Sequence, residues 1–131
     1  MVFLKTSSWT AVGFNYLLAA FAFQWGILVV NFWDQVWSDQ WQKIPLGVNA
    51  LITGDYAACA CMIAFGALLG KVDLFQAWIV VIFEIIFYGL NRAICLHTFF
   101  AKDVGGTMYI HTFAAFFGLG ASFFLQSNKA R

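Results

Sequence analysis

The sequence predicts an all-α, polytopic membrane protein with four transmembrane helices, and three observations support this prediction. Of its 131 residues, 63% are hydrophobic and only 10% are charged, whereas an average soluble domain has about 25% charged residues. Four apolar runs each approach the roughly 20 residues that a helix needs to cross a bilayer. One soluble domain of this length could not hide all four runs from water. We therefore expect a single transmembrane region over residues 1–131.

The first span is expected at about residues 11–33. Its polar members, Asn15 and Gln24, are expected to hydrogen-bond to neighbouring helices, because lipid offers them no partner. Residues 33–43 combine acidic and basic side chains with tryptophans. That composition is typical of an interfacial aromatic belt followed by a polar loop.

The second span is expected at about residues 46–70, with Pro45 in its first turn, where proline is tolerated. Gly66 and Gly70 form a small-xxx-small pair on one face, and such pairs favour close helix approach in lipid. Asp55 lies near the entrance of this span. It is interpreted either as a helix cap or as a charge at the mouth of a pathway.

The third span is expected at about residues 74–97, and residues 71–73 form a tight turn that makes the second and third spans antiparallel neighbours. Glu84 lies near its middle, and Arg92 and His97 lie toward its far end. Because Glu84 and Arg92 are separated by about 80° around a helix, we do not expect them to pair directly. His97, at the membrane edge, is expected to be solvated.

The fourth span, at about residues 105–125, contains no Asp, Glu, Lys or Arg. Ala114, Gly118 and Ser122 recur every fourth residue, and this ridge of small side chains implies a tightly packed helix. His111 lies in the same apolar run, about 9 Å below the helix start at roughly 1.5 Å per residue. An ionisable group at that depth is by default a hypothesis about function.

Three residues near this histidine helix each have a structural and a functional interpretation. Asp103 has the position of an N-cap that accepts hydrogen bonds from the N–H groups of Gly105 and Gly106, and its charge would also favour a nearby cation. His111 is either a core histidine bonded to a neighbouring helix or a residue that lines a permeation path. A neutral imidazole offers one donor and one acceptor, which suits a small polar molecule or a proton. Tyr56 is either a packing aromatic or a surface at a pore entrance.

The basic residues that flank the spans favour a cytoplasmic N-terminus. With that orientation the inner set is Lys5, Lys71, Lys129 and Arg131, and the outer set is Lys43 and Lys102. Arg92 then lies near the outer end of its span. Asp55, Tyr56 and Asp103 lie near the outer mouth, and His111 lies further in.

Composition and motifs argue against several classes of function. A net charge of +1 without a basic cluster gives no case for binding nucleic acid. The sequence has no phosphate-binding loop, zinc-protease motif or nucleophile elbow, so we expect neither an enzyme nor a cofactor. The two histidines lie on different spans, without a carboxylate or thiolate at ligand spacing, so no metal is expected. The cysteines, Cys59, Cys61 and Cys95, are expected to be small packing residues.

The segment around His111 carries a specific motif. Residues 102–119 read K-D-V-G-G-T-M-Y-I-H-T-F-A-A-F-F-G-L. This segment resembles the Rh glycoprotein branch of the ammonium transporter superfamily, whose pattern there is close to K-D-x-G-G-S-M-T-I-H-T-F-G-A-Y-F-G-L. Further landmarks in the same order are Phe3-Leu4-Lys5, Ala11-Val12-Gly13-Phe14-Asn15, Gln24-Trp25, Asp55 with Tyr56, and residues 64–71. The resemblance spans nearly the whole chain.

The resemblance implies a channel-like transporter of ammonia or ammonium in the plasma membrane, with an inverted-repeat fold in the lipid bilayer. The implied assembly is a homotrimer or an Rh-family hetero-oligomer. His111 would be the first of two pore histidines, Tyr56 would occupy the outer aromatic-gate position, and Asp103 would be the acidic residue at the outer start of the histidine helix. The implied mechanism is recruitment of ammonium, loss of a proton, and passage of neutral ammonia past the imidazoles.

The chain departs from the family pattern in three respects. The gate position usually holds phenylalanine, whereas Tyr56 adds a hydroxyl group. Arg92 replaces an acidic residue near the outer side, which would weaken the recruitment of cations. Family members have many more than four spans, so we expect an internal fragment whose second pore histidine lies beyond Arg131.

Two alternatives to ammonium transport are kept. One is conduction of carbon dioxide or another neutral gas, and the other is a non-transporting Rh-type membrane scaffold subunit.

Overall fold

The computed structural model describes residues 8–127 of the chain. Every regular element in this part is helical, which confirms the all-α fold. The elements are α1 (Ser8–Ser38), α2 (Val48–Leu68), α3 (Leu74–Ala93), the π-helix η1 (Ile94–Thr98), the π-helix η2 (Thr107–Thr112) and α4 (Phe113–Ser127). Four stretches are long and apolar enough to cross a membrane, namely Trp9–Ser38, Val48–Leu68, Leu74–Thr98 and Thr107–Leu125. The chain is therefore an integral membrane protein with four spans among its described residues.

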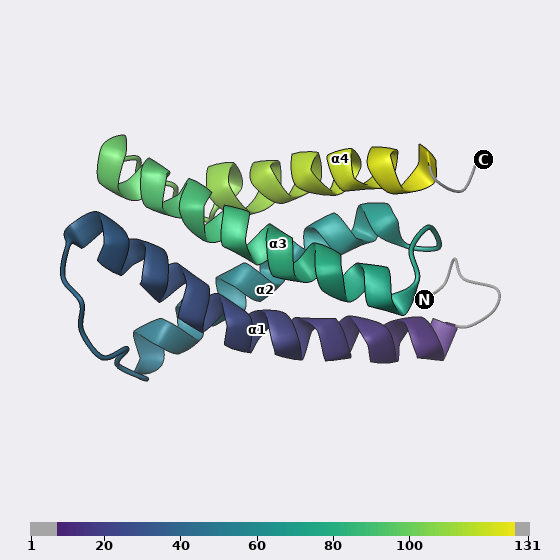
Figure 1. Ribbon diagram of the computed structural model, residues 1–131, viewed down its shortest axis with the longest axis horizontal. Coiled ribbons are helices and arrows are strands. Elements are labelled where there is room, and N and C mark those ends of the chain that lie inside the picture. Colours follow the sequence, from purple (N-terminus) through teal and green to yellow (C-terminus); the bar gives the residue numbers. More distant parts are fainter. Residues whose placement is uncertain (1–7, 128–131) are drawn as a thin grey trace.

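The helices form an elongated bundle in which α1 packs against both α2 and α3, and α4 packs mainly against α2 (Figure 1). The connections from α1 to α2 and from η1 to η2 lie at one end of the bundle. The turn between α2 and α3 lies at the other end, so these two helices are antiparallel, as predicted. Lys43 and Lys102 accordingly lie at the opposite end from Lys71. The other basic residues of the predicted inner set, Lys5, Lys129 and Arg131, lie outside the described residues.

The ends of the first two spans differ from the prediction. α1 continues to Ser38 rather than ending near residue 33, and the Ser38 hydroxyl donates to the backbone carbonyl of Asp34 at 2.8 Å. Pro45 lies outside α2, which begins at Val48, because the chain first makes a short turn in which the Gly47 N–H donates to the Pro45 carbonyl at 2.9 Å. The polar loop is consequently shorter than predicted.

The polar residues of the first span also differ from the prediction. The Gln24 side chain donates to the carbonyl of Ala20 in its own helix at 3.3 Å, and Asn15 is exposed. The predicted hydrogen bonds from these two residues to neighbouring helices are therefore wrong within the described part of the chain. A side-chain amide can satisfy itself on the carbonyl one turn earlier, and this local bond competes with an interhelical one.

The buried core has two parts. The first joins α1, α2 and α3 and consists of Leu18, Ala22, Val29, Ala58, Cys61, Ala77, Val81 and Ile85. The second joins α1, α2 and α3 to η2 and α4 and consists of Val30, Ala57, Ala60, Ala64, Tyr88, Ile110 and Ala114. Alanines supply most of the contribution of α2, so the neighbouring backbones approach closely. The second cluster fixes η2, and with it the candidate site, against α2.

The ridge of small residues on the fourth span is confirmed as a packing surface. Ala114 and Ser122 are buried, and a Cβ atom added to Gly118 would lie only 2.7 Å from the Ala64 carbonyl oxygen of α2. No side chain fits at that distance without moving a helix backbone. Gly118 is therefore a point of close contact between α4 and α2, as the sequence predicted.

The predicted close contact at Gly66 and Gly70 is wrong. A Cβ atom added to either glycine would meet no described heavy atom within 4 Å. Gly66 faces outward, and Gly70 has a φ of +75° in the turn that ends α2, a backbone conformation that favours glycine. The close contact on α2 occurs instead at Gly54, where a Cβ atom would lie 2.8 Å from the Phe23 carbonyl oxygen of α1.

These two environments predict opposite outcomes for the same substitution. Gly118→Val should lower the free energy of unfolding by about 1–3 kcal/mol, because overpacking forces α4 away from α2. Gly66→Val, the matched control in the neighbouring helix, should change it by less than about 0.5 kcal/mol. Thermal unfolding of both variants in one detergent measures the difference. Equal loss of stability in the two variants would contradict this packing.

The tight turn between α2 and α3 is confirmed, and side-chain hydrogen bonds stabilise it. The Asp73 carboxylate caps α3 together with Gln76, whose side-chain oxygen accepts the Asp73 N–H at 3.1 Å. Lys71 reaches across to α4 and donates to the Ser122 hydroxyl at 2.7 Å. This contact ties the turn to the fourth span at the end of the bundle opposite the candidate site.

Glu84 is the only acidic or basic side chain buried among the described residues, at 1% exposure. Its Oε1 atom has no hydrogen-bond partner among the described residues. Cys61 on α2 is buried beside the same part of α3, as predicted for a packing cysteine. Cys59 is exposed and Cys95 is half-buried, so the packing interpretation fails for Cys59 within the described chain.

Candidate functional site

Asp103 organises the start of the histidine helix. Its carboxylate accepts hydrogen bonds from the backbone N–H groups of Thr107 at 2.9 Å, Met108 at 2.6 Å and Tyr109 at 3.2 Å. These are the first N–H groups of η2, which have no partner within the helix itself. The capping role predicted for Asp103 is therefore confirmed, and its negative charge faces the positive end of the helix dipole.

The predicted capping partners, Gly105 and Gly106, are wrong by two residues. Both glycines have positive φ angles, +88° and +71°, and the helix begins only after them at Thr107. The Gly106 N–H donates to the Asp103 backbone carbonyl at 3.3 Å rather than to its carboxylate. The two glycines thus make a turn that folds the chain back so that one carboxylate reaches three N–H groups.

His111 lies five residues beyond this turn, in the π-helical part of the span. The carbonyl oxygen of Gly106 accepts the N–H groups of Ile110 at 2.9 Å and His111 at 3.0 Å, and the His111 Nδ1 lies 3.2 Å from the same oxygen. Because a carbonyl oxygen can only accept, Nδ1 must carry the proton of this bond. In the neutral imidazole, Nε2 is then an acceptor. Wide π-turns of this kind occur frequently at functional sites.

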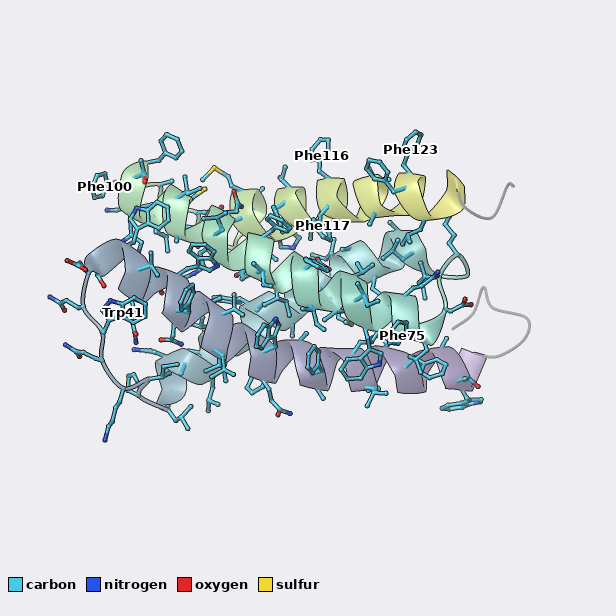
Figure 2. All side chains as sticks on the ribbon, in the orientation of Figure 1. Trp41, Phe75, Phe100, Phe116, Phe117 and Phe123 are labelled. Carbon is cyan, nitrogen blue, oxygen red and sulfur yellow. The ribbon has the colours of Figure 1, made fainter. Side chains whose placement is uncertain are left out.

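The His111 side chain is exposed, so the alternative of a core histidine bonded to a neighbouring helix is wrong for the described residues. The side chains of Phe116, Leu119 and Phe123, further along the same span, are exposed as well. Figure 2 shows Phe116 and Phe123 pointing away from the bundle, whereas Phe117 points toward it. The described helices therefore leave the histidine uncovered, like much of this apolar span.

Asp55 and Tyr56 lie on α2, beside the site but inside their helix. Asp55 follows Val48, the first residue of α2, by two turns, so the interpretation as a helix cap is wrong. It is exposed, and it makes no ion pair with a described residue. Tyr56 is 49% exposed. The packing interpretation of Tyr56 therefore accounts for only half of its surface.

The structure also reveals an ion cluster that the sequence did not predict, at the same end of the bundle. Arg92 Nη1 donates to both carboxylate oxygens of Asp34, at 3.0 and 2.9 Å, and His97 Nε2 lies 3.2 Å from Asp34 Oδ1. The predicted solvation of His97 is therefore only partial. Arg92 does not pair with Glu84, as expected from their angular separation. The sequence did contain an indication of this pair, because Asp34 and Arg92 have opposite charges and lie near the ends of two neighbouring spans at the same membrane face.

This cluster changes the interpretation of Arg92. Alone, an arginine in place of an acidic residue would repel cations from the outer end of the bundle. Paired with Asp34, its charge is compensated, so the pair adds little net charge there. Within residues 8–127, no three His, Cys, Asp or Glu side chains lie close enough together to hold a metal ion.

Comparison with known proteins identifies the family. The chain matches the Ammonium Transporter Family over residues 1–131. It is 43% identical over 122 residues to the ammonium transporter Rh type C-like 2 of Danio rerio, covering 93% of this chain and 25% of that protein. It is 41% identical over 125 residues to the ammonium transporter Rh type C of Oncorhynchus mykiss, covering 95% of this chain and 25% of that protein.

A human relative gives the same result. The chain is 43% identical over 119 residues to the ammonium transporter Rh type B of Homo sapiens, covering 91% of this chain and 25% of that protein. The chain thus spans about a quarter of the length of the curated relatives that it matches. No solved structure matches it. On the match along its whole length and these identities, the chain belongs to the Rh branch of the ammonium transporter family.

Proposed function

We propose that the chain forms part of a transport pathway for ammonium or ammonia, in a multi-pass protein of the plasma membrane that assembles as a homotrimer or Rh-family hetero-oligomer. The relatives named as ammonium transporters support the substrate. The observation that carries the proposal is His111, an exposed histidine on a span whose predicted core has no Asp, Glu, Lys or Arg. An ionisable side chain at that depth is expensive, so its presence there is by default a hypothesis about function.

The imidazole of His111 suits ammonia better than a permanent cation. Its Nδ1–H is held by the Gly106 carbonyl, so Nε2 presents a lone pair to a substrate N–H group. A bare cation in the middle of a bilayer costs several kcal/mol even by conservative scales, whereas ammonia is small and uncharged. Ammonium would therefore lose its proton before the narrow part of the pathway, and neutral ammonia would pass the imidazole.

Asp103, Asp55 and Tyr56 act at the entrance in this proposal. Asp103 is a positioning residue, because both of its oxygens are bonded to the backbone of the helix that carries His111. Asp55 is exposed beside Tyr56 and supplies the negative charge that attracts ammonium. The exposed half of Tyr56 offers a ring face to the cation and a hydroxyl to its N–H groups.

Stopped-flow permeability tests the proposal against its alternatives. The full-length protein is reconstituted into vesicles, and the uptake of ammonia and of carbon dioxide is measured separately. We expect ammonia to enter faster than into empty vesicles while carbon dioxide does not. Faster entry of carbon dioxide alone would indicate gas conduction, and no increase for either would indicate a non-transporting scaffold.

A further inference from the structure

Glu84 is buried near the middle of the third span without a basic partner. Its side chain is 1% exposed, and the span runs from Leu74 to Thr98. Arg92, the basic residue of α3, lies about two turns further along and pairs with Asp34 of α1. Among residues 8–127, Glu84 makes no ion pair. An ionised carboxylate there would lack both water and a counter-ion, which is expensive at membrane depth.

The helices packed around Glu84 bring no cation toward it. The titratable side chains of α1 are Asp34, which is already paired, and Tyr16, which is exposed, and α4 has none. On α2, three of the four titratable side chains are exposed, namely Asp55, Tyr56 and Cys59. The fourth is the buried Cys61, whose thiol lies against the Glu84 carboxyl group. The polar group that faces the carboxyl is therefore a thiol, which is only a weak hydrogen-bond donor.

Helix α3 is fastened to α1 on both sides of Glu84. The indole N–H of Trp25 donates to the Ile82 carbonyl at 3.4 Å, and that of Trp33 donates to the Ile86 carbonyl at 3.1 Å. Glu84 lies between these two carbonyls in the sequence, and its carboxyl group meets α2. A change of charge at Glu84 therefore acts on the contact between α3 and α2, because the contact between α3 and α1 has its own hydrogen bonds.

We propose that Glu84 is a proton-binding site that locks α3 against α2. In the closed bundle the carboxyl group keeps its proton and is neutral. The carboxylate that forms when the proton leaves can be hydrated only if α3 moves away from α2. Because opening then releases one proton, each rise of one pH unit favours the open state about tenfold. This lock responds to alkali and does not depend on the proposed transport function.

Two cysteines of α2 can report the opening in the full-length protein. Cys59 is exposed, whereas Cys61, two residues later, is buried at 0% exposure. The protein in detergent is treated briefly with iodoacetamide at a series of pH values from mildly acidic to alkaline, and both labels are quantified by peptide mass spectrometry. The ratio of Cys61 to Cys59 labelling corrects for the general rise of thiol reactivity with pH. We expect this ratio to rise about tenfold per pH unit in the wild type.

Variants of Glu84 should abolish this dependence on pH. Glu84→Gln keeps the shape of the neutral acid but cannot release a proton, so its labelling ratio should stay constant. Glu84→Met, an apolar side chain of similar length, is a second variant that should give the same constant ratio. Asp55→Asn is the matched control, since Asp55 is an acidic side chain of α2 that is already exposed. It should keep the rise of the wild type.

Three results would overturn the proposal. A ratio that stays constant with pH in the wild type would mean that opening releases no proton. An equal rise in the wild type and in both Glu84 variants would assign the proton to another group. Labelling of Cys61 as fast as Cys59 at neutral pH would mean that α2 and α3 are not closed around the carboxyl group.

Discussion

Replacing His111 with alanine is expected to reduce ammonia flux by roughly 10- to 100-fold while leaving the amount of protein in the membrane unchanged. The reduction corresponds to leaving an N–H group of neutral ammonia without its acceptor inside the membrane, which costs about 1–3 kcal/mol. The amount should not change, because the imidazole is exposed and its side-chain hydrogen bond within the described residues is to the Gly106 carbonyl of its own turn. Uptake of labelled methylammonium, normalised to surface protein, measures the effect.

The second histidine provides the matched control for this experiment. His97→Ala removes the same side chain from the outer end of the third span, where Arg92 still compensates Asp34. We expect its methylammonium uptake to stay within about twofold of the wild type, as for a surface substitution worth less than about 0.5 kcal/mol. If His111→Ala transported as well as His97→Ala, the exposed imidazole would not belong to the pathway.

The number and approximate position of the spans could be predicted because the bilayer fixes them. A helix needs about 20 apolar residues to cross the hydrocarbon region, and this requirement is visible in the sequence without any knowledge of neighbours. The polar ends were harder to predict. Helix α1 continues through Asp34 to Ser38, because a charged residue at the interface can stay helical when it is paired, as Asp34 is with Arg92.

The helix faces that touch could not be predicted with the same success. In water the polar face of a helix identifies its exposed side, but in lipid both faces are apolar and this signal is weak. Gly54 and Gly66 therefore look alike in the sequence, although only Gly54 is in close contact with another helix. Gly118 was predicted correctly because its small neighbours at Ala114 and Ser122 form a continuous ridge.

The sequence predicted which residues belong to the candidate site, but it did not predict their contacts. A cap at Asp103 follows from a carboxylate before an apolar run, but the exact N–H groups it binds depend on where the helix begins. The positive φ angles of Gly105 and Gly106 delay that start by two residues, and the Gly-Gly pair, which is a turn signal, was the available indication in the sequence. The exposure of His111 likewise depends on which face packs against α2.

Replacing Asp103 should give a different result from replacing His111, because it affects both stability and transport. Asp103→Ala leaves the N–H groups of Thr107, Met108 and Tyr109 without their shared acceptor. Loss of a helix cap costs about 0.5–2 kcal/mol in water. The cost should reach the upper part of that range or exceed it at a membrane interface, where fewer water molecules can replace the carboxylate. We expect a lower thermal midpoint in detergent and a loss of methylammonium uptake comparable to that of His111→Ala.

Asp103→Asn separates the two contributions of this residue. The amide oxygen can still accept hydrogen bonds from Met108 and Tyr109, but the amide NH2 cannot accept from Thr107 and the negative charge is removed, so only part of the thermal stability should return. Since Asp103 acts by positioning the helix, uptake should return together with stability. Restored stability with uptake still abolished would contradict the positioning role and would show that the charge itself acts on the cation. In that case Asp103 would belong with Asp55 among the residues that recruit ammonium at the entrance.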